Sequence, residues 1–254
     1  MRSLALFSLL SSFAFVAGPV AAADETVGEV SVAETYAITI AGIDIGDATL
    51  TVDALGPDYD AALTGDYRFL FWSGAIEAQA AGKHSAGGVG FAPATYRSRV
   101  DSPTRIFTTD ILFAGASTEG RWRADPPFED RDTVERVPIK PEHLTGAKDP
   151  LSAFLVPAES GEAACAGTLK VYSGVVRFDL DLRAIGAAKS ASDDAVECAV
   201  SYRPVSGHRV ESDEVNRLER DGLSISVFEI APGLWAPERV GFSTMFGTLA
   251  LTRR

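Results

Sequence analysis

Apolar and polar residues alternate with a period of two along most of the chain, which is the pattern of β-strands that bury one face. Between Glu34 and Leu55, two alternating stretches are separated by Gly42. Their apolar positions are Tyr36, Ile38 and Ile40, followed by Ala48, Leu50 and Val52. The pattern predicts a β-hairpin with one face in the core and one in solvent.

Similar stretches recur as far as the C-terminus, whereas helical periodicity is rare. They occupy residues 59–63, 67–72, 76–80, 96–99, 106–113, 169–182, 198–202, 223–230, 235–242 and 246–251. A short helix is predicted after Asp149, which can cap its N-terminus, with Pro150 in the first turn and Pro157 as a stop. The charged, proline-rich residues 123–150 and the polar residues 204–221 are predicted to be surface loops.

The strand predicted around residues 176–183 has the clearest division into faces. Val176, Phe178, Leu180 and Leu182 share one face, and Arg177, Asp179, Asp181 and Arg183 share the other, which we expect to be solvated. Together these patterns predict a mainly β fold with one or two short helices. The expected architecture is a large curled antiparallel sheet or an open, flattened β-barrel. We expect residues 24–254 to form a single domain, because no long Ser/Gly or Pro linker divides them.

The first residues have the layout of a cleaved secretory signal peptide. Arg2 precedes an apolar run from about Leu4 to Val16, and Ala21 to Ala23 supply small residues at a cleavage site. The run is shorter than the roughly 18 residues that a membrane span needs. We therefore expect a signal peptide over residues 1–23 and a soluble, periplasmic mature chain without a transmembrane segment.

Export also favours a disulfide between Cys165 and Cys198, the two cysteines of the chain. Thiols of exported proteins are normally paired, and these two do not have the C-x-x-C spacing of redox centres. Closing a loop of this length would stabilise the fold by roughly 3 to 4 kcal/mol.

Signs of catalysis, metal binding and nucleic-acid binding are lacking in the sequence. The formal net charge of −12 disfavours partners with a phosphate backbone. There is no G-x-S-x-G sequence, and His84, His143 and His208 lie far apart in sequence predicted to form loops. We expect these histidines to lie at the surface, and we expect a non-enzymatic protein with no metal and no cofactor.

Aromatic residues are more frequent than a one-sided sheet needs. They gather near the first third of the chain and again near its end. The candidates for a binding surface are Phe69, Phe71, Trp72, Trp235 and Phe242. One interpretation is that they fill the core. The other is that they line a slot for an apolar ligand on the concave side of a curled sheet. The pattern of residues does not separate the two.

Several short motifs, in order, resemble an exported Gram-negative family known as domain of unknown function 3108. They are Tyr36, Gly42-Ile43, Gly46-Asp47-Ala48, Trp72-Ser73-Gly74, Tyr96, Val137-Pro138, Asp149 to Ala153, Cys165 with Cys198, Phe178-Asp179 and Gly207-His208. The resemblance spans nearly all of the mature chain and implies a periplasmic, mainly β fold. It implies no catalytic residue.

Two functions therefore remain open. The first is a periplasmic protein that binds an apolar or lipid-like ligand in the concave face of its sheet. The alternative is an envelope interaction or structural protein with a solid core, which binds a protein partner or peptidoglycan through its polar loops, notably residues 123–148 and 204–221.

Overall fold

A computed structural model describes residues 29–85, 90–114, 117–127, 135–188, 194–244 and 246–254. The predicted signal peptide lies outside the described residues. Within them the chain forms one antiparallel sheet of fourteen strands that does not close on itself. This confirms the predicted mainly β class and the open, curled sheet.

Neighbouring strands in the chain are mostly neighbours in the sheet. The strands are β1 (Val30–Ile40), β2 (Ile43–Leu55), β3 (Asp58–Phe69), β4 (Trp72–Ser85), β5 (Gly90–Ser102), β6 (Arg105–Leu112), β7 (Glu119–Asp125), β8 (Val156–Pro157), β9 (Gly167–Tyr172), β10 (Arg177–Ala187), β11 (Val196–Ser206), β12 (Leu223–Ala231), β13 (Leu234–Thr244) and β14 (Gly247–Arg253). The order is β7-β6-β5-β4-β3-β2-β1-β14-β13-β12-β11-β10-β9, with β8 paired to β13. The pairing of β1 with β14 joins the first and last of the described strands in the middle of the sheet.

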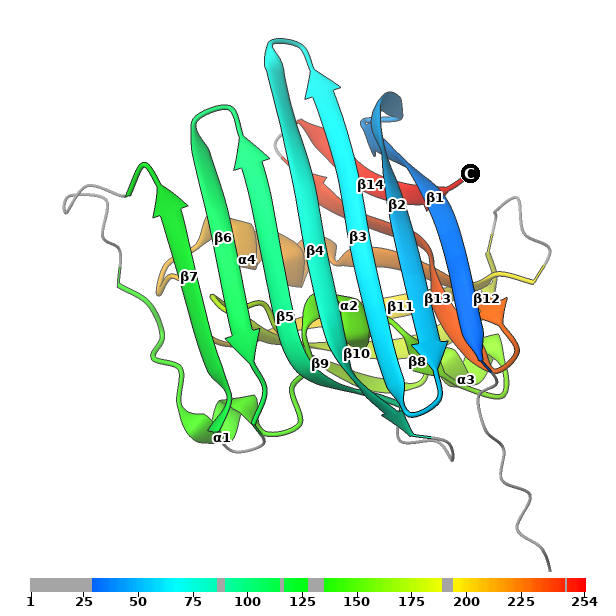
Figure 1. The fold of residues 1–254 in the computed structure, drawn as a ribbon. Coiled ribbons are helices and arrows are strands. Elements are labelled where there is room, and N and C mark those ends of the chain that lie inside the picture. The colour runs from blue at the N-terminus through cyan, green and yellow to red at the C-terminus, as the bar shows by residue number, and fades with distance from the viewer. Residues whose placement is uncertain (1–28, 86–89, 115–116, 128–134, 189–193, 245) are drawn as a thin grey trace, which may run out of the picture.

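The sheet folds over into two layers, with β1 to β7 in front and the strands from β9 to β13 behind (Figure 1). Directly paired residues share a face of a sheet. Following the pairs from β1 through β14, β13 and β12 to β11 gives Ile38, Leu251, Val240, Ile225 and Cys198. The same face is therefore apolar in both layers, and it is the concave face.

Short helices pack against the strands and cover parts of the sheet. They are α1 (Pro141–Leu144), α2 (Pro150–Ala153), α3 (Gly161–Ala164) and α4 (Asp213–Asp221). Helix α2, the one predicted from the sequence, contacts β3, β4 and β5 of the front layer and β9 of the back layer. The core between the layers includes an edge-to-face pair of Tyr59 and Phe91, whose ring centroids are 4.7 Å apart.

Helix α4 and strand β7 correct two loop predictions. Residues 204–221 are not one loop, because β11 continues to Ser206 and α4 begins at Asp213. The Ser212 hydroxyl accepts a hydrogen bond from the Val215 N–H, and Gly222 ends the helix at φ 69°. Ser212 and Gly222 are standard helix start and stop signals. Residues 123–125, predicted to be irregular, belong to β7.

The predicted disulfide between Cys165 and Cys198 is confirmed. Cys165 directly follows α3, and Cys198 lies on β11, two strands away from the β9 strand that Cys165 precedes. Both cysteines are buried in a second apolar cluster with Leu180, Ile225 and Trp235. The bond therefore fixes α3 on the concave face of the back layer.

Reducing this disulfide should destabilise the protein. With a loss of about 3 kcal/mol and about 2 to 4 °C per kcal/mol in a domain of this size, the thermal midpoint should fall by several degrees. Cys198→Ser should reproduce the fall. The Cys165→Ser/Cys198→Ser double variant is the control, because a reductant should not move its midpoint. A wild-type thermal midpoint that is unchanged on reduction would show that the disulfide does not stabilise the fold.

A buried carboxylate holds α2 in place between the layers. Asp149 Oδ1 accepts hydrogen bonds from the N–H groups of Leu151 and Ser152 at 2.9 Å, and its Oδ2 accepts one from the Ser152 hydroxyl. The Ser152 hydroxyl also lies 2.6 Å from the hydroxyl of Tyr59 on β3. Burial raises the pKa of Asp149 above its usual range, against the opposing effect of these hydrogen bonds.

Asp149→Asn should change how stability depends on pH. The pKa of Asp149 is higher in the folded than in the unfolded protein. The favourable contribution of its protonated carboxyl group to the unfolding free energy is therefore complete below the unfolded pKa. That contribution is lost as the pH rises through the folded pKa. The wild type should therefore lose unfolding free energy relative to the variant as urea titrations move from pH 4 to pH 7. If the unfolding free energies of the wild type and the variant changed in parallel with pH, burial would not raise the pKa of Asp149.

Candidate functional site

A pocket of about 680 Å³ lies between α4 and strands of the back layer. Its walls come from the segment at Arg136, from the β10 and β11 region, from α4 and from β12 and β13. The lining residues are Arg136, Val176, Phe178, Tyr202, His208, Arg209, Glu211, Ser212, Asp213, Val215, Leu218, Leu223 and Phe242. Ligand sites typically have volumes of roughly 300 to 1,000 Å³, so the pocket is large enough for a small ligand.

The floor of the pocket is apolar and comes from the concave face of the sheet. The rings of Phe178 and Tyr202 stack at 5.2 Å between centroids and 29° between planes. Antiparallel pairing of β10 with β11 places Tyr202 opposite Leu180, two residues along from Phe178, so both rings leave the same face. Leu223 and Phe242, which are directly paired on β12 and β13, extend this floor.

Helix α4 closes the opposite side with two apolar side chains. Val215 and Leu218 are three positions apart, so they lie on one face of the helix. Both line the pocket, whereas Asn216 is exposed. The remaining positions of this nine-residue helix are polar. The helix therefore has only two apolar side chains to place over the floor, and it covers the pocket without filling it.

The rim of the pocket is polar and is held by backbone pairing. Residues 135–137 pair with residues 207–210 through Val137 N–H to His208 O at 2.9 Å and Gly207 N–H to Val137 O at 2.7 Å. The guanidinium of Arg136 donates to the carbonyl of Gly207 at 2.7 Å. His208 Nε2 lies 3.1 Å from the Tyr202 hydroxyl, which connects the rim to the floor. Arg209, Glu211 and Asp213 give the rim both signs of charge.

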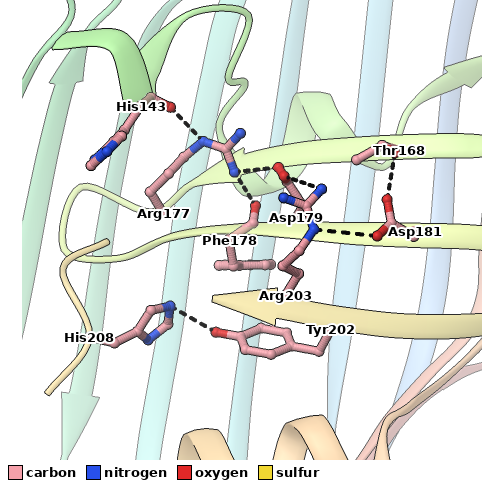
Figure 2. A network of polar contacts seen from close by, with 9 residues as sticks. All are labelled: His143, Thr168, Arg177, Phe178, Asp179, Asp181, Tyr202, Arg203 and His208. Carbon is pink, nitrogen blue, oxygen red and sulfur yellow. Dashed lines mark hydrogen bonds and ion pairs between the residues drawn. The ribbon is translucent and has the colours of Figure 1, made fainter. Parts of the chain in front are cut away.

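Behind the floor, the opposite face of β10 carries a buried ion pair (Figure 2). Arg177 Nη1 lies 2.6 Å from Asp179 Oδ1, and the two side chains are 4 % and 6 % exposed. That oxygen makes no geometrically aligned hydrogen bond, so the contact is ionic. Arg203, directly opposite on β11, reaches the other oxygen of Asp179 at 2.7 Å.

The ion pair is tied to the elements around the pocket. Arg177 Nε donates to the carbonyl of His143 in α1 at 2.8 Å, and its Nη1 donates to the carbonyl of Phe178. The network therefore fixes the backbone from which the Phe178 ring enters the floor. It extends outward through Arg203 to Asp181, which accepts a hydrogen bond from Thr168 (Figure 2).

Two predictions about polar residues need correction. Arg177 and Asp179 were expected on a solvated face but are buried, because the residues around α1 cover this end of β10. His84 and His208 were expected at the surface and are also buried, at 9 % and 8 % exposure. His84 packs near the ring of Phe91, and His208 packs against Tyr202.

The structure places the five predicted ligand-binding residues in three separate environments. Phe242 alone lines the pocket under α4. Trp235 is buried below α3 and donates from Nε1 to the carbonyl of Ala158 at 3.0 Å. A Cβ atom at Gly161 of α3 would lie 2.9 Å from the Trp235 ring, so α3 packs closely there. Phe69, Phe71 and Trp72 lie at the end of the β3–β4 hairpin.

Sequence reasoning missed most of the pocket. Phe178 was assigned to the apolar face of its strand and Tyr202 to a predicted strand, but neither was assigned to a site, and Val215 and Leu218 were placed in a loop. The capping residues Ser212 and Gly222 were the available signal for α4. His208 carried no signal, because its contact with Tyr202 depends on the pairing of residues 207–210 with the distant segment at Arg136.

The chain shows no similarity to a known protein that would assign a function to the pocket. Family models, curated proteins and solved structures give no match to the chain. Among the described residues, no three His, Cys, Asp or Glu side chains group as metal ligands. None of the described helices is long and apolar enough to span a bilayer.

Removing the charge of Asp179 should destabilise the fold strongly. Asp179→Asn leaves Arg177 buried without its counter-charge, and breaking a buried pair in this way costs about 3 to 5 kcal/mol. Asp110→Asn is the matched control, because Asp110 pairs with Arg97 on an exposed face and should cost less than about 1 kcal/mol. Urea unfolding of both variants measures the difference. Equal losses would show that the buried pair is not a structural constraint.

Proposed function

We propose that the protein is a non-enzymatic protein of the bacterial envelope that holds an apolar or lipid-like ligand on the concave face of its sheet. The observation that carries the proposal is the apolar-floored pocket between α4 and the back layer. Stacked rings on one side and Val215 and Leu218 on the other offer contact to an alkyl chain or a flat apolar group. Such lining with a few polar groups at the rim is typical of small-molecule sites.

The rim favours a ligand with a polar end. His208 and Arg136 are anchored by hydrogen bonds, whereas Arg209 is exposed at the mouth. An amphipathic ligand, such as a fatty acid, would place its chain on the floor and its carboxylate near the guanidinium groups of Arg136 and Arg209. The predicted periplasmic location supports this class of ligand, and the disulfide is weak support for an oxidising compartment.

The alternative is an envelope protein that binds a partner through its polar loops. Three exposed apolar side chains on or next to the paired segments beside the pocket favour it, namely Val137, Ile139 and Val210. The resemblance to the family of domain of unknown function 3108 stays a prediction, and it favours neither function because it implies no catalytic residue.

Leu218→Glu should weaken ligand binding by about tenfold or more, because it places a charge against the apolar floor and removes apolar contact. Titration with a fluorescent fatty acid measures the change. Asn216→Glu is the matched control, because it adds the same charge on the exposed side of the same helix and should leave affinity unchanged.

Two results would overturn the proposal. One is wild-type protein that binds the fluorescent fatty acid no better than an unrelated acidic protein and yields no ligand on lipid extraction. The other is equal binding by the Leu218→Glu and wild-type proteins, with thermal midpoints that show both to be folded.

A further inference from the structure

The most exposed large apolar side chains of the described residues gather at one end of the sheet. Phe71 is 98 % exposed and Leu70 is 73 % exposed, at the turn between β3 and β4. Trp72 at the start of β4, Phe246 in the β13–β14 turn and Ile43 at the start of β2 are also exposed. We call these five residues, Ile43, Leu70, Phe71, Trp72 and Phe246, the apolar rim.

Direct contacts hold the three turns of the apolar rim together. The Phe246 ring lies 5.6 Å from the Trp72 ring and 6.4 Å from the Phe69 ring, which joins the β3–β4 and β13–β14 hairpins. The N–H of Ala41, in the β1–β2 turn, donates to the carbonyl of Thr248 at 2.9 Å. These hairpin ends lie at the upper end of the sheet in Figure 1, where the β3–β4 hairpin projects furthest.

The shape and backbone of the apolar rim suit a lipid surface better than a protein groove. The residues belong to projecting hairpin ends (Figure 1), and none of them lines any of the four best-defined pockets of the described residues. Within the β13–β14 turn, Thr244 Oγ1 donates to Gly247 O at 2.6 Å and accepts from Phe246 N–H at 3.1 Å. A turn with internal hydrogen bonds can enter the headgroup region without exposing unpaired backbone groups to lipid. Trp and Phe are favoured at that depth.

Charges beside the apolar rim are arranged for a neutral, phosphate-bearing surface. Arg254 forms ion pairs with Asp44 and Asp47 on β2 at 2.8 and 2.6 Å, so its positive charge offsets part of the negative charge beside the apolar rim. Arg68, next to the apolar rim on β3, is exposed and has no ion-pair partner among the described residues, so it can meet lipid phosphate. The net charge of −12 disfavours a strongly anionic membrane.

From these observations we infer that the apolar rim is a peripheral docking site for the headgroup region of a phospholipid bilayer. Phe71, Leu70 and Trp72 enter the interface while the rest of the sheet stays in water. This inference does not depend on a ligand in the pocket under α4, because the rim and the pocket share no residue.

Flotation with phosphatidylcholine vesicles tests the inference, using protein purified from cells that express the full chain. The wild type should float with the vesicles, and raising the salt concentration should not release it. Phe71→Ser should reduce partitioning about tenfold, the effect expected for the loss of one buried phenyl ring. Ile185→Ser is the matched control, because Ile185 is also exposed but lies on β10, away from the apolar rim.

Wild-type protein that stays in solution with these vesicles would overturn the inference, and so would equal partitioning of Phe71→Ser and Ile185→Ser. Self-association through the rim is a separate outcome that also overturns it. Sedimentation would then show oligomers of the wild type that Phe71→Ser abolishes, without vesicle binding. Leu218→Glu should leave flotation unchanged, so failure of ligand binding and failure of docking can be distinguished.

Discussion

Burial of one continuous face of a wide, open sheet is the constraint on which the rest of the structure depends. Because directly paired residues share a face, the apolar side of β1 passes through β14, β13 and β12 to β11. Folding the sheet over covers part of this face with the sheet itself, and α2 fills the space between the layers. Helix α3, fixed by the disulfide, covers another part. Helix α4 is short and covers its part of the face without filling the pocket beneath it.

The pocket therefore exists because the helices cover the apolar face incompletely. Two sets of contacts hold the residues of its floor in place. Apolar surface that the fold leaves accessible is costly in water unless something binds there. Phe178 and Tyr202 hold their positions because the Arg177–Asp179 pair fixes one side of β10 and pairing to residues 135–137 fixes the end of β11. A polar network on one face of a strand thus sets the geometry of an apolar site on the other. Preorganised walls of this kind reduce the entropy that a ligand must lose on binding.

Local alternation predicted the fold class, the β1–β2 hairpin and the faces of β10. The capping residue Asp149 and the prolines around it predicted helix α2. Each of these signals depends on residues close in sequence. The disulfide was predicted from the expected export of the chain and from the number of cysteines. Burial of Arg177 and Asp179 was not, since alternation shows that two residues share a face but not whether a distant segment covers it. Here His143, more than thirty positions earlier, supplies the carbonyl that accepts from Arg177. The pocket depends on such long-range contacts and was missed for the same reason.

The abundance of aromatic residues has a physical explanation that alternation alone could not supply. Tyr59 and Phe69 lie on the same face of β3, as their spacing predicts, yet Tyr59 is fully buried and Phe69 lies among exposed side chains. Strands β3 and β4 span 12 and 14 residues, and their hairpin projects past the rest of the sheet (Figure 1). Beyond that point the concave face has no opposing layer. Position along the strand, not parity, therefore decides whether an aromatic residue of β3 packs in the core or meets the surroundings.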